Sequence, residues 1–556
     1  MSVKWLLGIL SGQKNLLGTS TQSLVVNKAI ASLIHYSLVE ATNETLSLHR
    51  LVQAVTRDRM PEELKHTWAV AIVNLMVEVF PQGTNPHDVR YWPECARLLA
   101  HALVAAEYAE EYGVELEKVA TLFNQAGLYL KSHAQYATAE SLYRRALEIW
   151  ENQLGRDHPR VAIGLGNLGE VLLAQGQYAA AEALARRALE ICKKQFGPDH
   201  PDTAKSLNDL AELLREQGQY AAAEPLHRRA LEIREKQLGP DHPDVAQSLN
   251  NLALLLHAQG QHAVAERLSR RDLEICEKQF GPDHPYTAKS LNNLAELLRA
   301  QGQYAAAEPL LRRALEICEK QLGPDHPDTA QSLNNLAGLF YAQDRYTAAE
   351  PFLRRALEIC EKQFGPDHPY TAMSLNNLAE LLRAQGQFAA AEPLFCRALE
   401  INEKQFGPDY PGTALSLENL AELLYTQGQY AAAEPLVRRA LEILEKRLGR
   451  DHPQIATGLS NLVKLLRAQG QYAAAEPLVR CALEIDEKAY GPNHPIVATD
   501  LNDLAELLRA QSEYAAAEPL YRRAIAILEK TLGPEHPNTK MVRENLEILL
   551  SERSRK

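Results

Sequence analysis

The chain has 556 residues, with 59 Lys and Arg against 71 Asp and Glu, which gives a formal net charge of −12. This balance argues against nucleic acid as a partner, because nucleic acid needs a concentrated basic face. No apolar run reaches the ~18 residues of a membrane span, so no membrane partner is expected. The apolar content of 46% argues against general disorder, and the aromatic content of 6% predicts a core packed mainly on Ala and Leu.

The first 113 residues contain no internal repeat. Leu38–Thr42 and Leu46–His49 are predicted to be short strands around the turn-like cluster Asn43-Glu44-Thr45. Helical patterns are expected at 23–36, 51–59, 62–80 and 92–112. This region therefore predicts a helical segment that contains one hairpin.

The segment SLVEATNETLSLHRLVQAVTRD resembles the winged-helix segment of STAND-type NTPases, the NB-ARC or NACHT class. Leu48-His49-Arg50 stands where that family has a Met-His-Asp motif whose His contacts nucleotide phosphates. The resemblance therefore implies two alternative roles for His49: it contacts a nucleotide, or it packs within the hairpin region. No Gly-x-x-x-x-Gly-Lys-[Ser/Thr] loop occurs in the sequence. We expect residues 1–60 to be a winged-helix-like remnant without its NTPase domain, followed by a helical linker over 61–113.

A Gly-Pro-Asp-His-Pro cluster, with drift in some copies, then recurs along the chain at intervals of 42 residues without one insertion. Its glycines are Gly155, Gly197, Gly239, Gly281, Gly323, Gly365, Gly407, Gly449, Gly491 and Gly533. Such strict spacing predicts one structural module stacked many times.

Residues 281–322 show how one module is built. Apolar residues at steps of three and four predict a first helix from Pro285 to about Ala300 and a second from Tyr304 to about Leu322. Gly302 is expected to adopt a positive φ in the turn between them. A lone helix pair cannot bury both of its faces, so neighbouring modules must stack.

This pattern resembles the tetratricopeptide repeat (TPR), and the matching small and large positions are Leu294, Ala295, Leu298, Gly302, Tyr304, Ala307, Leu311 and Ala314. The usual unit has about 34 residues, and the longer unit is similar to that of kinesin light chains. The resemblance implies an all-α, right-handed α-solenoid of ten helix pairs over 114–534. Residues 535–556 are expected to form a capping helix that ends near Leu550 and a polar tail.

Nine histidines recur in register, and four of the seven cysteines share one repeat position. Helices in a stack lie about 8–10 Å apart, so equivalent histidines cannot share one metal ion. No nucleophile–base pair stands apart from the repeated pattern. We therefore expect no metal, no cofactor and no enzymatic activity, and reduced thiols favour a cytoplasmic protein.

Asparagines form a polar stripe beside the apolar one on the first helices. The candidate groove residues are Asn167, Asn251, Asn293, Asn335, Asn377, Asn419 and Asn461. The resemblance to TPR proteins implies that this stripe lines a concave groove, where amides bond a peptide backbone. The alternative is that Asn tolerates a solvated helix face and was copied by duplication.

A neighbouring position varies from unit to unit, and we expect it to set specificity. Its candidate residues are Arg299, Tyr341, Arg383, Tyr425 and Arg467. The favoured function is a non-catalytic scaffold that binds a peptide or partner protein. The alternatives are the sensor half of a STAND-type switch and a cargo adaptor similar to kinesin light chain, although the sequence lacks the heptad coiled coil of that family.

Overall fold

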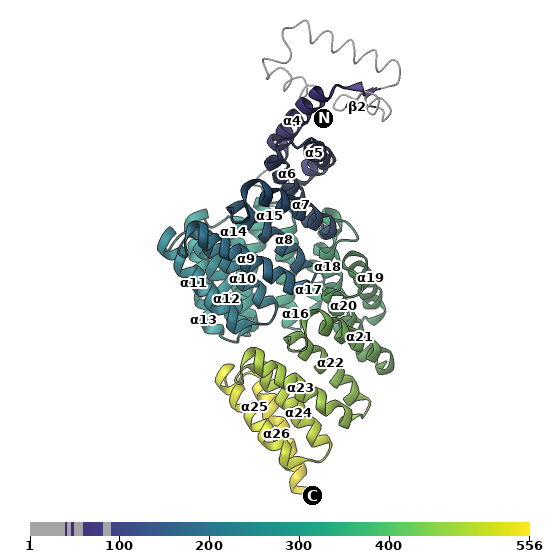
Figure 1. The fold of residues 1–556 in the computed structure, drawn as a ribbon. Helices are drawn as coiled ribbons and strands as arrows, with labels where there is room; N and C mark the ends of the chain where they lie inside the picture. Colours follow the sequence, from purple (N-terminus) through teal and green to yellow (C-terminus); the bar gives the residue numbers. More distant parts are fainter. Residues whose placement is uncertain (1–38, 42–45, 49–58, 82–90, 556) are drawn as a thin grey trace. The chain divides into compact units, whose positions relative to one another are not determined.

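The structure is a computed structural model that describes residues 39–41, 46–48, 59–81 and 91–555. The chain divides into two compact units. The first comprises residues 1–79 and 101–119, and the second comprises residues 80–100 and 120–556. Figure 1 shows the elements in chain order.

The first unit contains the predicted hairpin. β1 (Val39–Ala41) pairs antiparallel with β2 (Leu46–Leu48), and Val39 lies opposite Leu48. The strand prediction is therefore confirmed, whereas the helices expected at 23–36 and 51–59, and His49, lie outside the described residues. The predicted helix at 62–80 is α4 (Glu62–Val79), and the one at 92–112 is α5 (Trp92–Glu111).

Ten helix pairs follow, at the predicted positions. The first helices of the pairs are α6 (Leu116–Ser132), α8 (Pro159–Ala174), α10 (Pro201–Glu216), α12 (Pro243–Ala258), α14 (Pro285–Ala300), α16 (Pro327–Ala342), α18 (Pro369–Ala384), α20 (Pro411–Thr426), α22 (Pro453–Ala468) and α24 (Pro495–Ala510). The second helices are α7 (Tyr136–Leu154), α9 (Tyr178–Phe196), α11 (Tyr220–Leu238), α13 (His262–Phe280), α15 (Tyr304–Gln321), α17 (Tyr346–Phe364), α19 (Phe388–Phe406), α21 (Tyr430–Leu448), α23 (Tyr472–Tyr490) and α25 (Tyr514–Thr531).

The repeated histidines are helix caps. In α14 the Nδ1 atom of His284 accepts the backbone N–H of Tyr286 at 3.2 Å, and Pro285 occupies the first helical position. The same bond recurs before most first helices, for example at His452. It satisfies one of the unpaired N–H groups at a helix start, which explains the recurring His-Pro pair.

The turn inside each pair requires a left-handed residue. Gly302 has φ +72°, as predicted, and its N–H bonds the carbonyl of Arg299. Ala134, Asp344 and Ser512 occupy the equivalent position in three other pairs and also have positive φ. The second helix then runs without interruption through Pro309.

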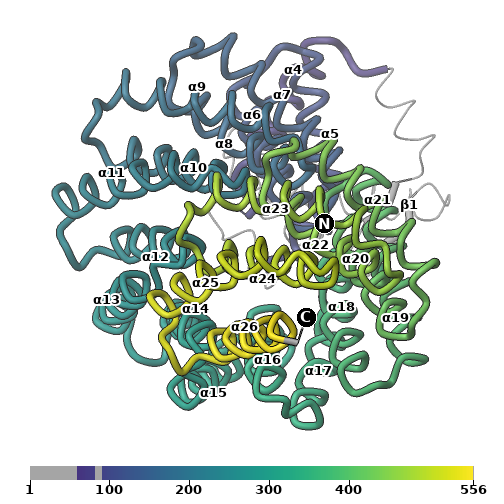
Figure 2. Tube along the Cα trace, turned by 90° about the horizontal axis from the view of Figure 1, so that it is seen from below, coloured from purple at the N-terminus to yellow at the C-terminus, as the bar shows by residue number. Residues whose placement is uncertain are grey.

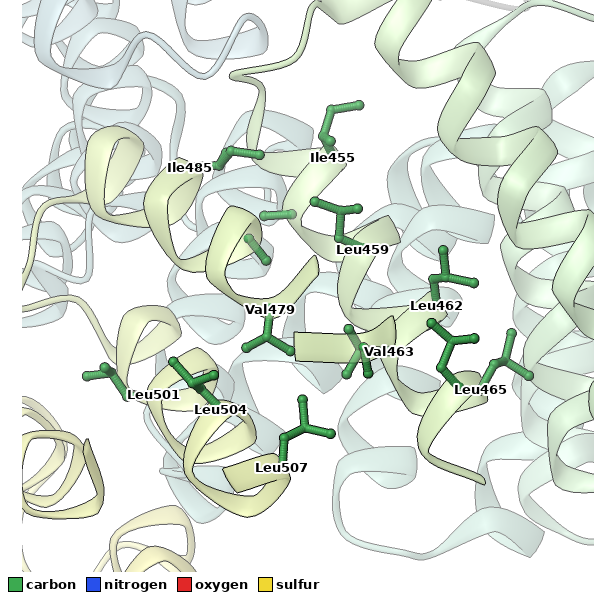
Figure 3. Packing of buried hydrophobic residues seen from close by; sticks show 14 of the residues in the cluster. Ile455, Leu459, Leu462, Val463, Leu465, Val479, Ile485, Leu501, Leu504 and Leu507 are labelled. Carbon is green, nitrogen blue, oxygen red and sulfur yellow. The ribbon is translucent and has the colours of Figure 1, made fainter. Parts of the chain in front are cut away.

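The core consists mainly of Ala and Leu from both helices of each pair. Figure 3 shows this packing at α22–α24, where Val463 of α22 lies near Val479 of α23, and Leu504 of α24 lies close by. Buried alanines such as Ala475 and Ala505 let the helices approach closely. The predicted reliance on Ala and Leu is thus confirmed for the described residues.

At most junctions a buried polar pair joins a second helix to the following first helix, whereas Trp150/Gly164, Leu444/Gly458 and Leu528/Val542 stand at these positions in three of them. The Oγ atom of Ser374 donates to Sγ of Cys360 at 3.3 Å, and the repeated cysteines serve this contact. Other junctions use Arg234 with Ser248, Asn402 with Ser416, and two carboxyls, Asp486 with Asp500.

Within the second unit the array curves until distant pairs meet. Figure 2 shows α20–α23 passing beside the region of α8–α11. The rings of Tyr220 and Tyr490 stack at 5.2 Å, and those of Tyr136 and Phe406 stack at 5.4 Å. One superhelical turn is therefore closed by contacts between side chains about 270 residues apart.

The last helix is longer than expected. α26 spans Pro537–Arg555, so the tail predicted to follow Leu550 continues the helix. Glu552 accepts a bond from Arg509 at 2.8 Å, and Arg553 donates to Glu518 at 2.7 Å. These ion pairs to the last repeat stabilise the helix through its polar end. A prediction from the spacing of apolar residues cannot include them.

Candidate functional site: the inner surface of the first helices

The polar stripe lies on the inside of the curve. Successive first helices contact one another, for example α14 with α16 and α18 with α20, whereas successive second helices are farther apart. The first helices therefore form the inner surface. Most of the predicted asparagines are half-buried there, and Asn377 is exposed.

Three of the predicted amides are bonded between repeats. Asn293 Nδ2 donates to Asn250 Oδ1 at 2.7 Å. Asn167 Nδ2 donates to Asn124 Oδ1 at 2.8 Å, and Asn461 Nδ2 contacts Glu418 Oε1 at 3.4 Å. These side chains hold adjacent first helices together, so at least one N–H of each amide is already taken within the protein.

The remaining asparagines differ among themselves. Asn251 and Asn335 accept bonds from Gln247 and Gln331 of their own helices, each at 2.8 Å. The side-chain amides of Asn377 and Asn419 form no hydrogen bond with any residue in the described part of the chain. These two amides, on neighbouring helices α18 and α20, keep both donor and acceptor free.

Apolar side chains beside these two amides were missed by sequence reasoning. Met373 is 40% exposed and Leu415 is 55% exposed, each one helical turn before the free amide of its helix. In preceding repeats the same position carries Gln331 or Lys289. The change from polar to apolar at a copied position is the signal that could have revealed them.

The charges near these amides are paired or weakened, since Arg383 of α18 pairs with Glu380 and lies 3.9 Å from Glu422 of α20. Glu418 occupies the position that Asn fills in the preceding repeat, and burial raises its pKa to about 7. A carboxyl with this pKa is partly neutral at physiological pH. Asn377, Asn419, Met373 and Leu415 thus form a mixed amide and apolar surface, which we call the α18–α20 patch.

The variable position is mostly tied to neighbouring carboxylates. Arg299 pairs with Glu296, and Arg383 donates to Glu380 at 2.5 Å. The hydroxyl of Tyr341 donates to Glu380 at 2.9 Å, and burial together with this carboxylate raises the Tyr341 pKa to about 12. Because these side chains are already held by hydrogen bonds and ion pairs, we expect them to form rigid parts of the inner surface rather than to change conformation around a ligand.

Two of the predicted residues come together farther along. Tyr425 and Arg467 line one cavity of about 400 Å³ with Glu506 and Arg509. Arg467 pairs with Glu506, and Arg509 pairs with Glu552 at 2.8 Å. Lys464 also lines the cavity, which is therefore polar and predominantly basic.

The described residues contain no group of three or more His, Cys, Asp or Glu side chains placed to hold a metal ion. No helix in the described ranges is both long and apolar enough to cross a membrane. The chemistry that this surface offers is hydrogen bonding by free amides together with apolar contact.

Comparisons place this architecture among known proteins. The tetratricopeptide repeat family model matches residues 117–194, 161–236, 205–278, 244–320, 287–362, 328–404, 397–446, 454–530 and 501–556. No curated protein sequence matches the chain.

Several solved structures are similar in part. One contains nearly identical TPR-like repeats of a Podosopora anserina protein described as a kinesin light chain, with 26% identity over 37% of this chain and 97% of that one, and a TM-score of 0.33. BtubC from P. vanneervenii is 25% identical over 42% of this chain and 92% of its own, with a TM-score of 0.34. The apo form of RapI is 19% identical over 51% and 98%, with a TM-score of 0.39. These TM-scores lie below 0.5, so the assignment rests on the family model, which covers most of the chain: the chain belongs to the tetratricopeptide repeat family.

Proposed function

We propose that the protein is a non-catalytic scaffold that binds an extended peptide of a partner protein along the inner surface, with its strongest contacts at the α18–α20 patch. The observation that carries this proposal is the pair of unbonded amides, Asn377 and Asn419, beside the exposed Met373 and Leu415. An amide matches the donor and acceptor of a peptide group, and the apolar side chains supply area to bury. Membership of a repeat family whose stacked helices form extended concave surfaces supports this proposal.

The test begins with peptides selected from a random library on the purified full-length protein. The affinity of a selected peptide is then measured by calorimetry for wild type and for the double variant Asn377→Ala/Asn419→Ala. Two lost hydrogen bonds of about 0.5–1.5 kcal/mol each weaken binding roughly tenfold.

Asn293→Ala is the matched control, because the Asn293 amide donates to Asn250 within the protein and lies outside the α18–α20 patch. We expect this variant to bind the peptide as wild type does. Equal affinity of the double variant and wild type would contradict the proposal.

A second candidate function is the regulatory half of a STAND-type signalling switch that acts with an NTPase on a separate chain. The antiparallel pairing of β1 and β2 supports it, since a winged-helix segment requires this hairpin. In this case the NTPase encoded beside the gene forms a complex with the chain, and His49→Ala lowers the nucleotide affinity of that complex. Failure of the two purified proteins to associate would count against this role.

A further inference from the structure

We propose that a cavity between α8, α9 and α10 is a specificity pocket that takes one large apolar side chain of a bound peptide, while a Lys or Arg of the same peptide pairs with Asp209. This inference rests on the proposed peptide-binding function. The cavity has a volume of about 290 Å³ and lies within the second and third helix pairs.

The cavity exists because two facing side chains are truncated in one repeat. Gly166 of α8 and Ala185 of α9 both line it. A Cβ atom added to Gly166 would meet no atom within 4 Å, so the glycine faces open space. No other repeat reduces both of these positions to such small residues.

The following repeat shows what normally fills this space. The equivalents of Gly166 and Ala185 there are Asn208 and His227, and Nδ1 of His227 lies 2.9 Å from Oδ1 of Asn208. Both side chains are buried. The second repeat therefore lacks a plug that its neighbour has, at the same place in the same fold.

The walls select an apolar occupant. Leu165, Ala181 and Ala188 are buried and line the cavity, and Ile163 beside it is 53% exposed. Pockets for small molecules begin at about 300 Å³, so this volume suits a single large side chain better than a whole metabolite. An apolar cavity that opens on a surface gains most from an apolar group that displaces its water.

The mouth of the cavity lies on the inner surface. Asn167 and Asp209 both line it, and both belong to the asparagine stripe position of their helices. A peptide that follows this stripe therefore passes directly over the opening. The pocket thus extends the proposed binding surface to the second and third helix pairs, well before the α18–α20 patch along the chain.

The negative charge of Asp209 at the mouth of the cavity indicates that a basic residue lies next to the apolar side chain of the ligand. Glu170 already pairs with Lys131, whereas Asp209 forms no hydrogen bond or ion pair with any described residue. Desolvation by neighbouring residues raises the pKa of Asp209 to about 6, although the charges of Lys205 and Arg234 oppose this rise, so the carboxyl is mostly ionised at neutral pH. A Lys or Arg next to the apolar anchor would form the direct ion pair with Asp209 that Lys205 and Arg234 do not make.

The experiment compares the peptides that different full-length variants select from one random library. The plugged variant Gly166→Asn/Ala185→His restores the pair of the following repeat, and Asp209→Asn removes the charge. Gly338→Asn is the matched control, because an added Cβ at Gly338 on α16 also meets open space. Gly166→Ser is the milder alternative if the plugged variant fails to unfold cooperatively on heating.

Wild type and Gly338→Asn are expected to enrich peptides that carry a large apolar residue next to Lys or Arg. The plugged variant should lose the apolar preference by about tenfold or more, and Asp209→Asn should lose the basic preference. Unchanged enrichment on the plugged variant overturns the pocket. If those same peptides depend on Asn377 and Asn419, the peptide-binding function stands without the pocket, whereas no enrichment over bare resin overturns both.

Discussion

The Nε2 atom of His452 lies 2.9 Å from the backbone carbonyl oxygen of Glu216, which is 236 positions earlier in the chain. Because Nδ1 of the same ring accepts the N–H of Gln454, Nε2 carries the proton and donates it to that carbonyl. One neutral imidazole therefore caps α22 and also fastens one superhelical turn to the next. His494 is buried at an equivalent place, near Gly260.

These turn contacts are expected to open in acid. Burial lowers the pKa of His452 below 6.5 and that of His494 to about 4. Each imidazole therefore binds a proton more readily when the turn contact is open than when it is closed. Their stabilisation is complete above about pH 6.5 and is lost as the pH falls toward 4. Small-angle scattering should therefore show a growing radius of gyration over this range.

The variant His452→Asn/His494→Asn separates this effect from acid unfolding in general, because Asn keeps a capping oxygen but does not titrate. It should lose most of the acid-dependent expansion. His200→Asn is the control, since His200 caps α10 in the same way with a side chain that is 42% exposed. Expansion of the same size in all three proteins would show that the histidines do not hold the turns together.

The junction between α23 and α24 is expected to weaken at high pH. Burial raises the pKa of both Asp486 and Asp500, the charge of Asp486 raises that of Asp500 further, and the hydrogen bond from Asp500 opposes the rise at Asp486. Protons are held more tightly in the folded state than in the unfolded one, so stability falls as the pH rises above about 4. Asp486→Cys/Asp500→Ser installs the pair found at Cys360 and Ser374, and its melting temperature should exceed that of wild type most at alkaline pH. A constant difference at all pH values would contradict this assignment.

The left-handed turn position offers a test of backbone strain. Ala134 has φ +57° where most repeats have Gly, and a left-handed Ala is disfavoured by about 1–2 kcal/mol. Ala134→Gly should therefore raise the free energy of unfolding by about 0.5–1 kcal/mol, after the loss of one buried methyl and the greater freedom of Gly in the unfolded chain. Gly302→Ala should lower it by a similar amount. Denaturant titration measures both, and a destabilised Ala134→Gly would show that methyl packing outweighs the strain.

Sequence periodicity predicted most of the fold, because a 42-residue spacing fixes where helices begin and end. The bounds of α14, Pro285–Ala300, follow from the proline at its start and the glycine turn after it. The closure of the superhelical turn was not predictable in this way. It depends on small rotations between repeats that accumulate until His452 reaches Glu216, and no local pattern encodes that sum.

The candidate site was predicted less completely. The pattern placed the asparagines on one face, but whether an amide is free depends on the neighbouring repeat: Asn293 donates to Asn250, whereas Asn377 has no such bond. The pocket beside Gly166 was missed because it results from two truncated side chains on different helices. Such a cavity can be recognised only when the residues at both positions are compared with those of the other repeats and the two positions are known to lie in contact.

The most direct test of the central claim is to locate a bound peptide on the protein. A selected peptide that carries a photoreactive group is cross-linked to the full-length chain, and the attachment sites are identified by mass spectrometry. The account predicts cross-links on first helices, above all at α18 and α20 near Met373 and Leu415. Cross-links confined to the outward faces of second helices such as α17 and α19 would contradict it.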